Sequence, residues 1–468
     1  MSLIVMKFGG TSVADAEAIS HVAAILMEQW ASDHRIVAVV SAMSGVTDLL
    51  TRGVCAAATG DGSVCRHIAE EILHRTCEVA QQLIASNVAR QAVLTAAAYV
   101  LASYVDVCQS VHVLAEATPR VLDRATSCGE LLVADLLAAH LCAKGCPSEA
   151  IHPAQVIVTD DTFQNALPML PETKAKCSQL LAPLLSRGNI PVLGGFIGAT
   201  SEGVITTLGR GGSDFSAAVL GQALDADEVW IWTDVDGVMS ADPRLVEDAR
   251  VIPVLSYAEV GELAYFGAAV LHPRTIRPLV DRRIPLRIKN TFRPQSSGTR
   301  IEPEANPTPG TVKAVTHIQG LSMVTVEGRG MLGVPGIAAR TFEAVARCKA
   351  NVLMISQASS EQSICFVIPA SDVACVRGEL EETFALEIAR CEIDRVGALD
   401  GMGVVTALGA GMRGVTGVAG RLFTALARHG VNIIAIAQGS SECSVSVVVQ
   451  ESDGERAVRA IHEEVMRS

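Results

Sequence analysis

A lysine and a glycine pair stand near the start of the chain, in Lys7-Phe8-Gly9-Gly10. An apolar run at 3–6 precedes them and predicts a strand buried on both faces, while apolar spacing from 19 to 27 predicts a helix after them. Glycines at such a turn let backbone N–H groups approach an anion, and the helix N-terminus adds partial positive charge. Lys7 could then contact phosphate oxygens. The pattern is not a Walker motif, and a tight turn with a solvated lysine is the alternative.

A second charged group lies between glycines, in Gly209-Arg210-Gly211-Gly212-Ser213-Asp214, just before a helix expected at 215–224. An arginine in this setting can hold a carboxylate or a phosphate through two parallel hydrogen bonds. Asp214 could orient a cation such as Lys7 or a bound metal. The alternative is that Ser213 or Asp214 only caps the helix and that Arg210 lies on the surface.

Two further stretches carry polar residues where elements meet. A strand expected at 35–40 ends in small hydroxyl residues between Ser41 and Thr47, where α/β folds bind ligands. Ser127 and Glu130 have the spacing of a capping box at a helix start. A carboxylate there could also bind a ligand ammonium, and the residues alone leave both interpretations open.

The elements that must position these residues alternate along the first 290 residues. Further strands are expected at 156–159, 190–193, 228–232 and 286–289, helices at 174–187 and from 256 to 262, and almost continuous helix from 64 to 144. Four strands end in Gly, Ser, Thr, Asp, Lys or Arg. This order indicates an open α/β sheet with its ligands at the carboxyl ends of the strands.

The composition fits a large folded protein. The chain has 468 residues, 49% of them hydrophobic and 19% charged, which favours about three domains with sizeable cores. The net charge of −13 disfavours a nucleic-acid or membrane-surface binder. Thirteen cysteines without a CxxC pair indicate reduced thiols. We see no signal-peptide pattern and expect no bilayer-spanning stretch, so the expected location is the cytoplasm.

The last third of the chain holds an internal repeat. Gly330-Met331 recurs as Gly411-Met412 and Asn351 as Asn432, an offset of 81 residues. Each copy reads strand, helix, strand, strand, helix, and the first adds a strand near 387–396. Because the second copy has no room for that strand, residues 312–318 or another strand of the first copy should complete its sheet. We therefore predict domains at 1–293, 312–397 and 398–468, with a Pro-rich linker at 294–311 and two intertwined copies.

Five motifs in this order resemble aspartate kinase (aspartokinase): residues 7–13, 41–47, 127–130, 206–214 and 232–238. The repeat resembles the paired ACT domains of that family. The resemblance implies an α/β fold with an open, mostly parallel sheet sandwiched by helices (the amino acid kinase fold), plus two α+β ferredoxin-like ACT domains. The closest likeness is to the kinase halves of bifunctional aspartokinase–homoserine dehydrogenases. Because the chain ends after the second repeat, we expect a monofunctional kinase.

The resemblance further implies transfer of the ATP γ-phosphoryl group to the β-carboxylate of L-aspartate, with Mg²⁺ bridging the phosphates mostly through ATP and water and no metal-binding residue assigned. The implied catalytic residues are Lys7 and Asp214. The implied substrate-binding residues are Thr47, Glu130, Phe196, Thr207, Arg210 and Ser213, and the ATP-binding residues are Lys7, Gly9, Gly10, Ser41, Thr233, Asp234, Met239 and Arg244. Two positions depart from the family: Met239 stands where a tyrosine is frequent, and Ala269 where a lysine is frequent. These two departures leave the affinity for the nucleotide and the choice of nucleotide open.

The ACT copies imply an amino-acid effector, threonine more than lysine, and at least a homodimer. The effector residues carried over are Met331, Asn351, Gln357, Asn432 and Gln438. Alternatively, these residues only cap strands and form a subunit interface. His272, before a proline, is expected to pack or cap rather than bind metal. Two other functions stay open: a kinase of the same fold acting on another acid such as glutamate, and an amino-acid-binding regulator with a weak kinase domain.

Overall fold

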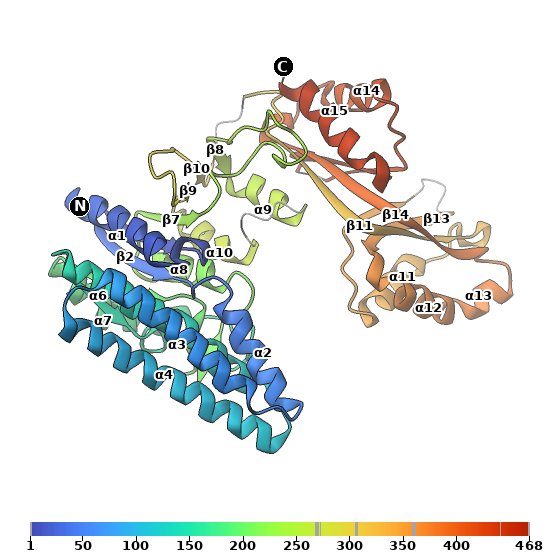
Figure 1. Cartoon of the computed structure of the whole chain (residues 1–468). Helices are drawn as coiled ribbons and strands as arrows, with labels where there is room; N and C mark the ends of the chain where they lie inside the picture. The colour runs from blue at the N-terminus through green and yellow to red at the C-terminus, as the bar shows by residue number, and fades with distance from the viewer. Residues whose placement is uncertain are drawn as a thin grey trace. The chain divides into compact units, whose positions relative to one another are not determined.

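The computed structural model describes residues 2–266, 271, 273–304, 308–357, 362–439 and 441–466. Ala269 and His272, on which two of the expectations above depend, lie outside the described residues. The chain forms two compact units (Figure 1). The first comprises Met1–Val238, Val251–Tyr257 and Ala269–Ala305, and the second Met239–Arg250, Ala258–Ala268 and Asn306–Ser468.

The first unit is built on an eight-stranded sheet. Its strands, in spatial order, are β3 (Ser148–Ile151), β4 (Ile190–Gly194), β2 (Arg35–Val40), β1 (Leu3–Phe8), β7 (Glu228–Thr233), β9 (Leu286–Asn290), β10 (Thr299–Glu302) and β8 (Val254–Ser256). Among the described residues of this sheet, only β10 and β9 pair antiparallel. The sheet is therefore open and mostly parallel, which confirms the predicted fold class. The central strand β1 is buried along its whole length, as a strand covered on both faces must be.

Helices cover both faces of this sheet (Figure 1). Alternate strand residues such as Met6, Phe8 and Val40 join one core with the helices α1 (Ala16–Ala31), α2 (Val46–Ala58), α3 (Val64–Leu83), α4 (Asn87–Leu114) and α6 (Cys128–Ala143). The helices α7 (Leu170–Ser186), α8 (Gly212–Ala223) and α10 (Pro273–Arg282) pack together, with α8 on β1. The short pieces α5 (Pro119–Thr126), β5 (Ile197–Ala199) and β6 (Ile205–Thr207) complete the unit.

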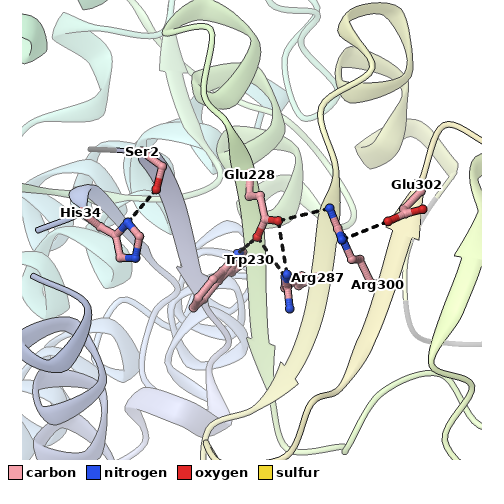
Figure 2. Close-up of polar contacts among 7 residues, drawn as sticks. All are labelled: Ser2, His34, Glu228, Trp230, Arg287, Arg300 and Glu302. Carbon is pink, nitrogen blue, oxygen red and sulfur yellow. Dashed lines mark hydrogen bonds and ion pairs between the residues drawn. The ribbon is translucent and has the colours of Figure 1, made fainter. Parts of the chain in front are cut away.

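The expected linker at 294–311 contains a strand of this sheet. Strand β10 lies within it and pairs with β9 and β8. Figure 2 shows how Glu228 of β7 joins these strands: its carboxylate accepts from Trp230 Nε1 (2.6 Å) and Arg287 Nε (2.9 Å) and lies 3.6 Å from an Arg300 guanidinium nitrogen. Arg300 also pairs with Glu302 (3.1 Å). The four-residue strand escaped sequence analysis because prolines, serines and glycines surround it.

One other local expectation is wrong, and one of the alternatives left open does not occur. Residues 156–159 form no strand; only isolated bridges occur, Val158 with Ala199 and Thr159 with Pro168. Ser127 does not cap α6, because its hydroxyl donates to the carbonyl of Arg124 (2.9 Å). Helices α5 and α6 therefore follow each other with only Ser127 between them.

Two helical stretches, Asn87–Leu114 and Pro119–Ala143, have the length and mean hydropathy of a membrane span, contrary to the expectation from sequence. The second is 78% buried inside the unit, as expected of a core helix. The first is 28% buried; its inner residues, including Leu101 and Tyr104, belong to the core shared with α3. Its hydropathy comes from alanines and valines spread around the helix rather than from one apolar face.

The second unit is built on a six-stranded antiparallel sheet. Its spatial order is β12 (Met354–Gln357), β13 (Ser363–Pro369), β11 (Ala314–Glu327), β14 (Arg395–Leu408), β16 (Ser444–Gln450) and β15 (Ala435–Gln438). The long strands β11 and β14 each bend at a register shift and serve both repeat copies. Residues 321–327 of β11 pair with β13 of the first copy, whereas 314–318 pair only with β14 and complete the second copy.

Helices α11 (Ile337–Arg347) and α12 (Val373–Thr383) belong to the first copy, and α14 (Val418–Arg428) and α15 (Gly454–Met466) to the second. Each pair covers its own apolar core. The strand expected near 387–396 begins only at Arg395, because α13 (Ala385–Ala389) occupies the earlier residues. The cysteines are not all reduced: a disulfide joins Cys348, at the end of α11, to Cys375 in α12.

Helix α9 (Tyr257–Tyr265) packs almost entirely in the second unit. Phe266, which follows it, joins Leu321, Met402 and Val448 in a core on the sheet. Glu259 is fully buried and pairs with Lys313 (Nζ–Oε2 2.9 Å). Helix α9 thus lies between β8 and β9 of the first unit in sequence, yet it contributes to the core of the second unit.

Candidate active site

A cavity of about 540 Å³ opens at the carboxyl ends of the parallel strands of the first unit. Backbone hydrogen bonds hold the loops that line it side by side. Gly9 N donates to Trp232 O (3.0 Å), Ser41 N to Phe8 O (3.1 Å) and Gly195 N to Val40 O (2.7 Å). The hydrogen-bonded pairing thus continues one residue beyond the ends of β1, β2 and β4. This edge of the sheet is where open α/β folds bind ligands.

The cavity brings together most of the residues expected to touch substrate or nucleotide. Those in its lining are Lys7, Gly9, Gly10, Ser41, Thr47, Glu130, Phe196, Ser213, Asp214, Thr233 and Asp234. Sequence reasoning did not single out others that share the lining, among them Thr11, Met43 and Asp48. Thr11 and Met43 lie inside the motifs at 7–13 and 41–47, and Asp48 directly follows the second, so their place in these motifs is the signal that could have found them.

Lys7 is the cation of the cavity. Its side chain projects from buried β1, is mostly buried, and its Nζ lies 2.5 Å from Asp214 Oδ1 in the first turn of α8. Gly211 precedes α8 with a left-handed backbone (φ +70°), a conformation that favours glycine. The α8 N-terminus therefore faces the cavity beside a lysine that Asp214 orients. Such a site favours anions, phosphate among them.

Glu130 places a buried carboxyl group in the same cavity. Its side chain is buried in the first turn of α6, and Oε2 has no hydrogen-bond partner within the described residues. Burial raises the pKa of Glu130 to about 8, although the amides of Glu130 and Ala42 act in the opposite direction. A buried carboxylate that lacks a cation is costly. A ligand group that brings a positive charge would lower this cost.

Phe196 and Ser213 shape the wall between these charges. Phe196 has a left-handed backbone (φ +68°), which is strained for a residue with a side chain. Two hydrogen bonds hold it there: its amide donates to Ser216 Oγ (2.9 Å), and its carbonyl accepts from Leu208 N (2.9 Å). A Cβ on the preceding Gly195 would lie 2.6 Å from Ser213 Cβ, so only glycine fits there.

Four expected residues lie outside the cavity lining. Thr207 is buried, and its hydroxyl donates to Asp123 Oδ1 (2.6 Å). Arg210 is exposed, between the lining residues Gly209 and Gly211. Met239 and Arg244 belong to the second unit, where Arg244 pairs with Asp242 (2.6 Å).

The effector residues divide between two smaller cavities of the second unit. Met331 and Gln357 line one of about 290 Å³ at the start of α11. Gln438 lines its repeat counterpart of about 240 Å³ at the start of α14, together with Glu442, whose carboxylate accepts from Gly414 N (2.7 Å). Asn351 and Asn432 are exposed and line neither cavity. Residues 358–361 and 440 of the repeated motif lie outside the described residues.

Comparison with known proteins agrees with this site. The amino acid kinase family model matches residues 2–290, and an ACT domain model matches 324–384 and 405–465. The aspartokinase of Schizosaccharomyces pombe is 31% identical over 500 residues, covering 99% of this chain and 92% of that protein. This chain belongs to the aspartokinases of the amino acid kinase family.

Other relatives and solved structures extend the likeness. A bifunctional aspartokinase/homoserine dehydrogenase of Zea mays is 38% identical over 464 residues, which cover 98% of this chain but 50% of that protein. The chain thus spans about half the length of the first curated relatives it matches. Clostridium acetobutylicum aspartate kinase (TM-score 0.82, 28% identity, 99% and 100% of the two chains) and E. coli aspartokinase III with aspartate and ADP (0.78, 29%, 99% and 100%) share the architecture.

Proposed function

We propose that this aspartokinase-family chain transfers the γ-phosphoryl group of ATP to the β-carboxylate of L-aspartate, giving 4-phospho-L-aspartate and ADP. The observation that carries the proposal is one cavity that holds both Lys7, paired with Asp214, and the buried carboxyl group of Glu130, whose Oε2 has no hydrogen-bond partner within the described residues. A substrate that is both an amine and an acid fits this pair, and a phosphate fits the lysine. The names of the relatives support the choice of aspartate.

The reaction needs little proton transfer. A β-carboxylate oxygen, already an anion, forms the new bond to the γ-phosphorus while the bond to the bridging oxygen of ADP breaks. Lys7 neutralises charge on the transferred group, and Asp214 fixes its position. Glu130 takes the substrate ammonium, Arg210 its α-carboxylate, and Thr47, Phe196 and Ser213 shape the pocket. Catalysis is then positioning plus charge neutralisation.

The nucleotide would enter over the glycine turn. Gly9, Gly10 and Ser41 line the phosphate path, Thr233 and Asp234 lie at the end of β7, and Met239 and Arg244 are assigned to the nucleotide by resemblance. The described residues contain no cluster of three side chains suited to a metal. Mg²⁺ would therefore be held mainly by the nucleotide phosphates and water, with a cavity carboxylate such as Asp234 within the same site, and would offset phosphate charge.

The test is hydroxylamine trapping of the acyl phosphate. We expect ATP-dependent formation of aspartyl hydroxamate from L-aspartate and none from L-glutamate. Hydroxamate from glutamate alone would favour a kinase for another acid. The absence of any product, with amino-acid binding retained, would favour the regulator that the departure at Met239 suggests.

We also propose that an end-product amino acid, threonine rather than lysine, inhibits the enzyme through the ACT cavities. The two cavities at equivalent places support this, each with a glutamine, Gln357 or Gln438, in its wall. An effector inhibits only by binding two conformations with different affinity. The matched variants Gln357→Ala and Gln438→Ala should each weaken inhibition by threonine. Unchanged inhibition in both would remove the effector assignment.

At least a homodimer is expected from the ACT copies, with a cytoplasmic location. Ile355 and Ile436, at equivalent places in β12 and β15, are about half exposed (51% and 45%) and offer apolar surface for a second copy. Light scattering on the eluting protein should give at least twice the chain mass of 49.0 kDa. A monomer at micromolar concentration would contradict the assignment.

A further inference from the structure

Asp123, on α5, is a fully buried carboxylate that does not line the active-site cavity. It accepts four hydrogen bonds from two segments far along the chain. Gln164 N donates to Oδ1 (3.1 Å) and Oδ2 (2.9 Å), Thr207 N to Oδ2 (3.0 Å) and Thr207 Oγ1 to Oδ1 (2.6 Å). None of the ion pairs found among the described residues includes Asp123. Its charge is thus balanced by oriented N–H and O–H groups, although burial still raises its pKa.

The donors belong to a pair of segments that lead into the cavity. Thr207 ends β6, and the next residues are Leu208, Gly209 and Arg210. Ala166 N donates to Thr207 O (3.0 Å), so the segment after Gln164 runs beside β6. A Cβ on Gly209 would lie 2.9 Å from Gln164 O, which shows how closely the two segments pack. Asp123 is the acceptor that they share.

The same helical stretch carries Glu130. Helix α5 ends at Thr126 and α6 begins at Cys128, so Asp123 and Glu130 are seven residues apart in almost continuous helix. Glu130 lines the cavity from one side, and Gly209 and Gly211 line it on either side of Arg210 in sequence. Asp123 therefore connects the element that bears the buried anion to the loop that bears the arginine.

We propose that Asp123 is a positioning residue that fixes the Arg210 loop relative to Glu130, and so sets the separation of the groups that grip the two charged ends of the amino-acid substrate. This inference rests on the proposed aspartate kinase activity. Asp123 acts through Thr207 and the loop and does not touch the substrate. Its loss should therefore weaken the hold on the amino acid and leave the nucleotide, bound over Gly9 and Gly10, almost unaffected.

Asp123→Asn tests this with little change of shape. It replaces one carboxylate oxygen, which accepts hydrogen bonds, with an NH2 group that faces hydrogen-bond donors. We expect the KM for aspartate to rise about tenfold or more, since hydrogen bonds to a charged acceptor are strong. The KM for ATP should change less than about twofold, because the loop does not form the phosphate path. Thr207→Val should act in the same direction, and Thr207→Ser, which keeps the hydroxyl, should restore values near wild type.

Glu228→Gln is the matched control. Glu228 is another carboxylate with several partners (Figure 2), although it is partly rather than fully buried. It begins β7, at the amino ends of the strands, and does not line the cavity. It should lower thermal stability without separating the two KM values. A separation in this variant as well would mean that any damage to the unit weakens aspartate binding, and would overturn the proposal.

Hydrogen exchange gives a readout that needs no activity. Asp123→Asn, or Thr207→Val if that variant does not fold, should speed amide exchange in 164–167 and 205–212 and leave β1 protected. Unchanged exchange there, or equal increases of both KM values, would overturn the inference. If the wild type makes no aspartyl hydroxamate, the proposed function fails, and the exchange pattern still decides whether Asp123 positions the loop.

Discussion

The surroundings of a single residue, Glu130, indicate the charge of the ligand group that it binds. Its carboxylate lies buried at the start of α6 and pairs with no cation among the described residues, and burial raises its pKa to about 8. Lys7 has the opposite arrangement, a buried cation with Asp214 in contact. The two residues therefore differ in the ligand charge that each can bind. Glu130 can bind a positively charged group, and Lys7 can bind further negative charge.

The first prediction concerns pH. Below about pH 8 the Glu130 carboxyl of the free enzyme is largely protonated, and it must ionise to bind the substrate ammonium. Because the folded pKa lies above the ordinary value, kcat/KM for aspartate should rise with pH up to about 8, while stability falls over the same range. In Glu130→Gln this rising limb should vanish and kcat/KM should be low throughout. If the variant shows the same rise of kcat/KM with pH, the rise reports the ionisation of another group and not of Glu130.

The second prediction concerns Lys7→Ala. We expect kcat to fall by roughly 10²–10³-fold, as for loss of one preorganised electrostatic contact to the transition state. The two KM values should change by less than about threefold, because Lys7 acts mainly on charge that develops during transfer. Steady-state kinetics at saturating aspartate and ATP measure both. Higher KM values with unchanged kcat would make Lys7 a binding residue only.

At the scale of elements, the two repeat copies differ where the first strand meets its loop. In the first copy Arg329 N donates to Asp394 (3.3 Å). In the second copy Lys313 stands at the position equivalent to Asp394, and Ala410 N donates instead to Glu259 of α9 (2.7 Å). The second copy thus has a lysine where the first copy has the accepting carboxylate of Asp394, and Glu259 of α9 supplies the carboxylate instead.

The third prediction follows from this pair. Glu259→Gln keeps an acceptor for Ala410 N but removes the carboxylate charge that pairs with Lys313, whose side chain is 15% exposed. It should lower the free energy of unfolding by about 3 kcal/mol, at the low end for a broken buried pair. The double variant Glu259→Gln/Lys313→Met should recover much of this loss. Urea denaturation of the full chain measures both, and equal stabilities of single and double variants would contradict the role of the pair.

At the scale of the whole molecule, the second unit is one folding body rather than two. Strands β11 and β14 each run through both copies, and each copy's half-sheet contains a strand from the other. Loss of one half would leave β11 or β14 with unpaired backbone groups along half its length, which is costly.

The fourth prediction tests this coupling. Phe366→Ala empties a fully buried site in the core of the first copy and should cost about 3–5 kcal/mol. Because the copies share strands, amide exchange should accelerate in β16 and α15 of the second copy as well as in β13 and α12. Acceleration confined to the first copy would show that the halves unfold independently.

The sequence by itself determined the kind of fold and the content of the site. Buried strands, glycine turns and polar residues at strand ends predicted an open α/β sheet, and Lys7, Glu130 and Asp214 share its cavity. The 81-residue repeat predicted that a strand of the first copy completes the second sheet, and residues 314–318 of β11 do so. These signals are local or periodic, so they can be read along the chain.

Only the tertiary structure decided what depends on residues distant in sequence. Nothing around Asp123 marks it, because its partners lie 41 and 84 residues away. The strand β10 is held in the sheet by Glu228 and by its neighbours, against a local composition typical of a linker. Helix α9 joins the second unit because a buried carboxylate needs Lys313 and the Ala410 amide. Burial and long-range pairing override local propensity at these places, and they exist only once the chain has folded.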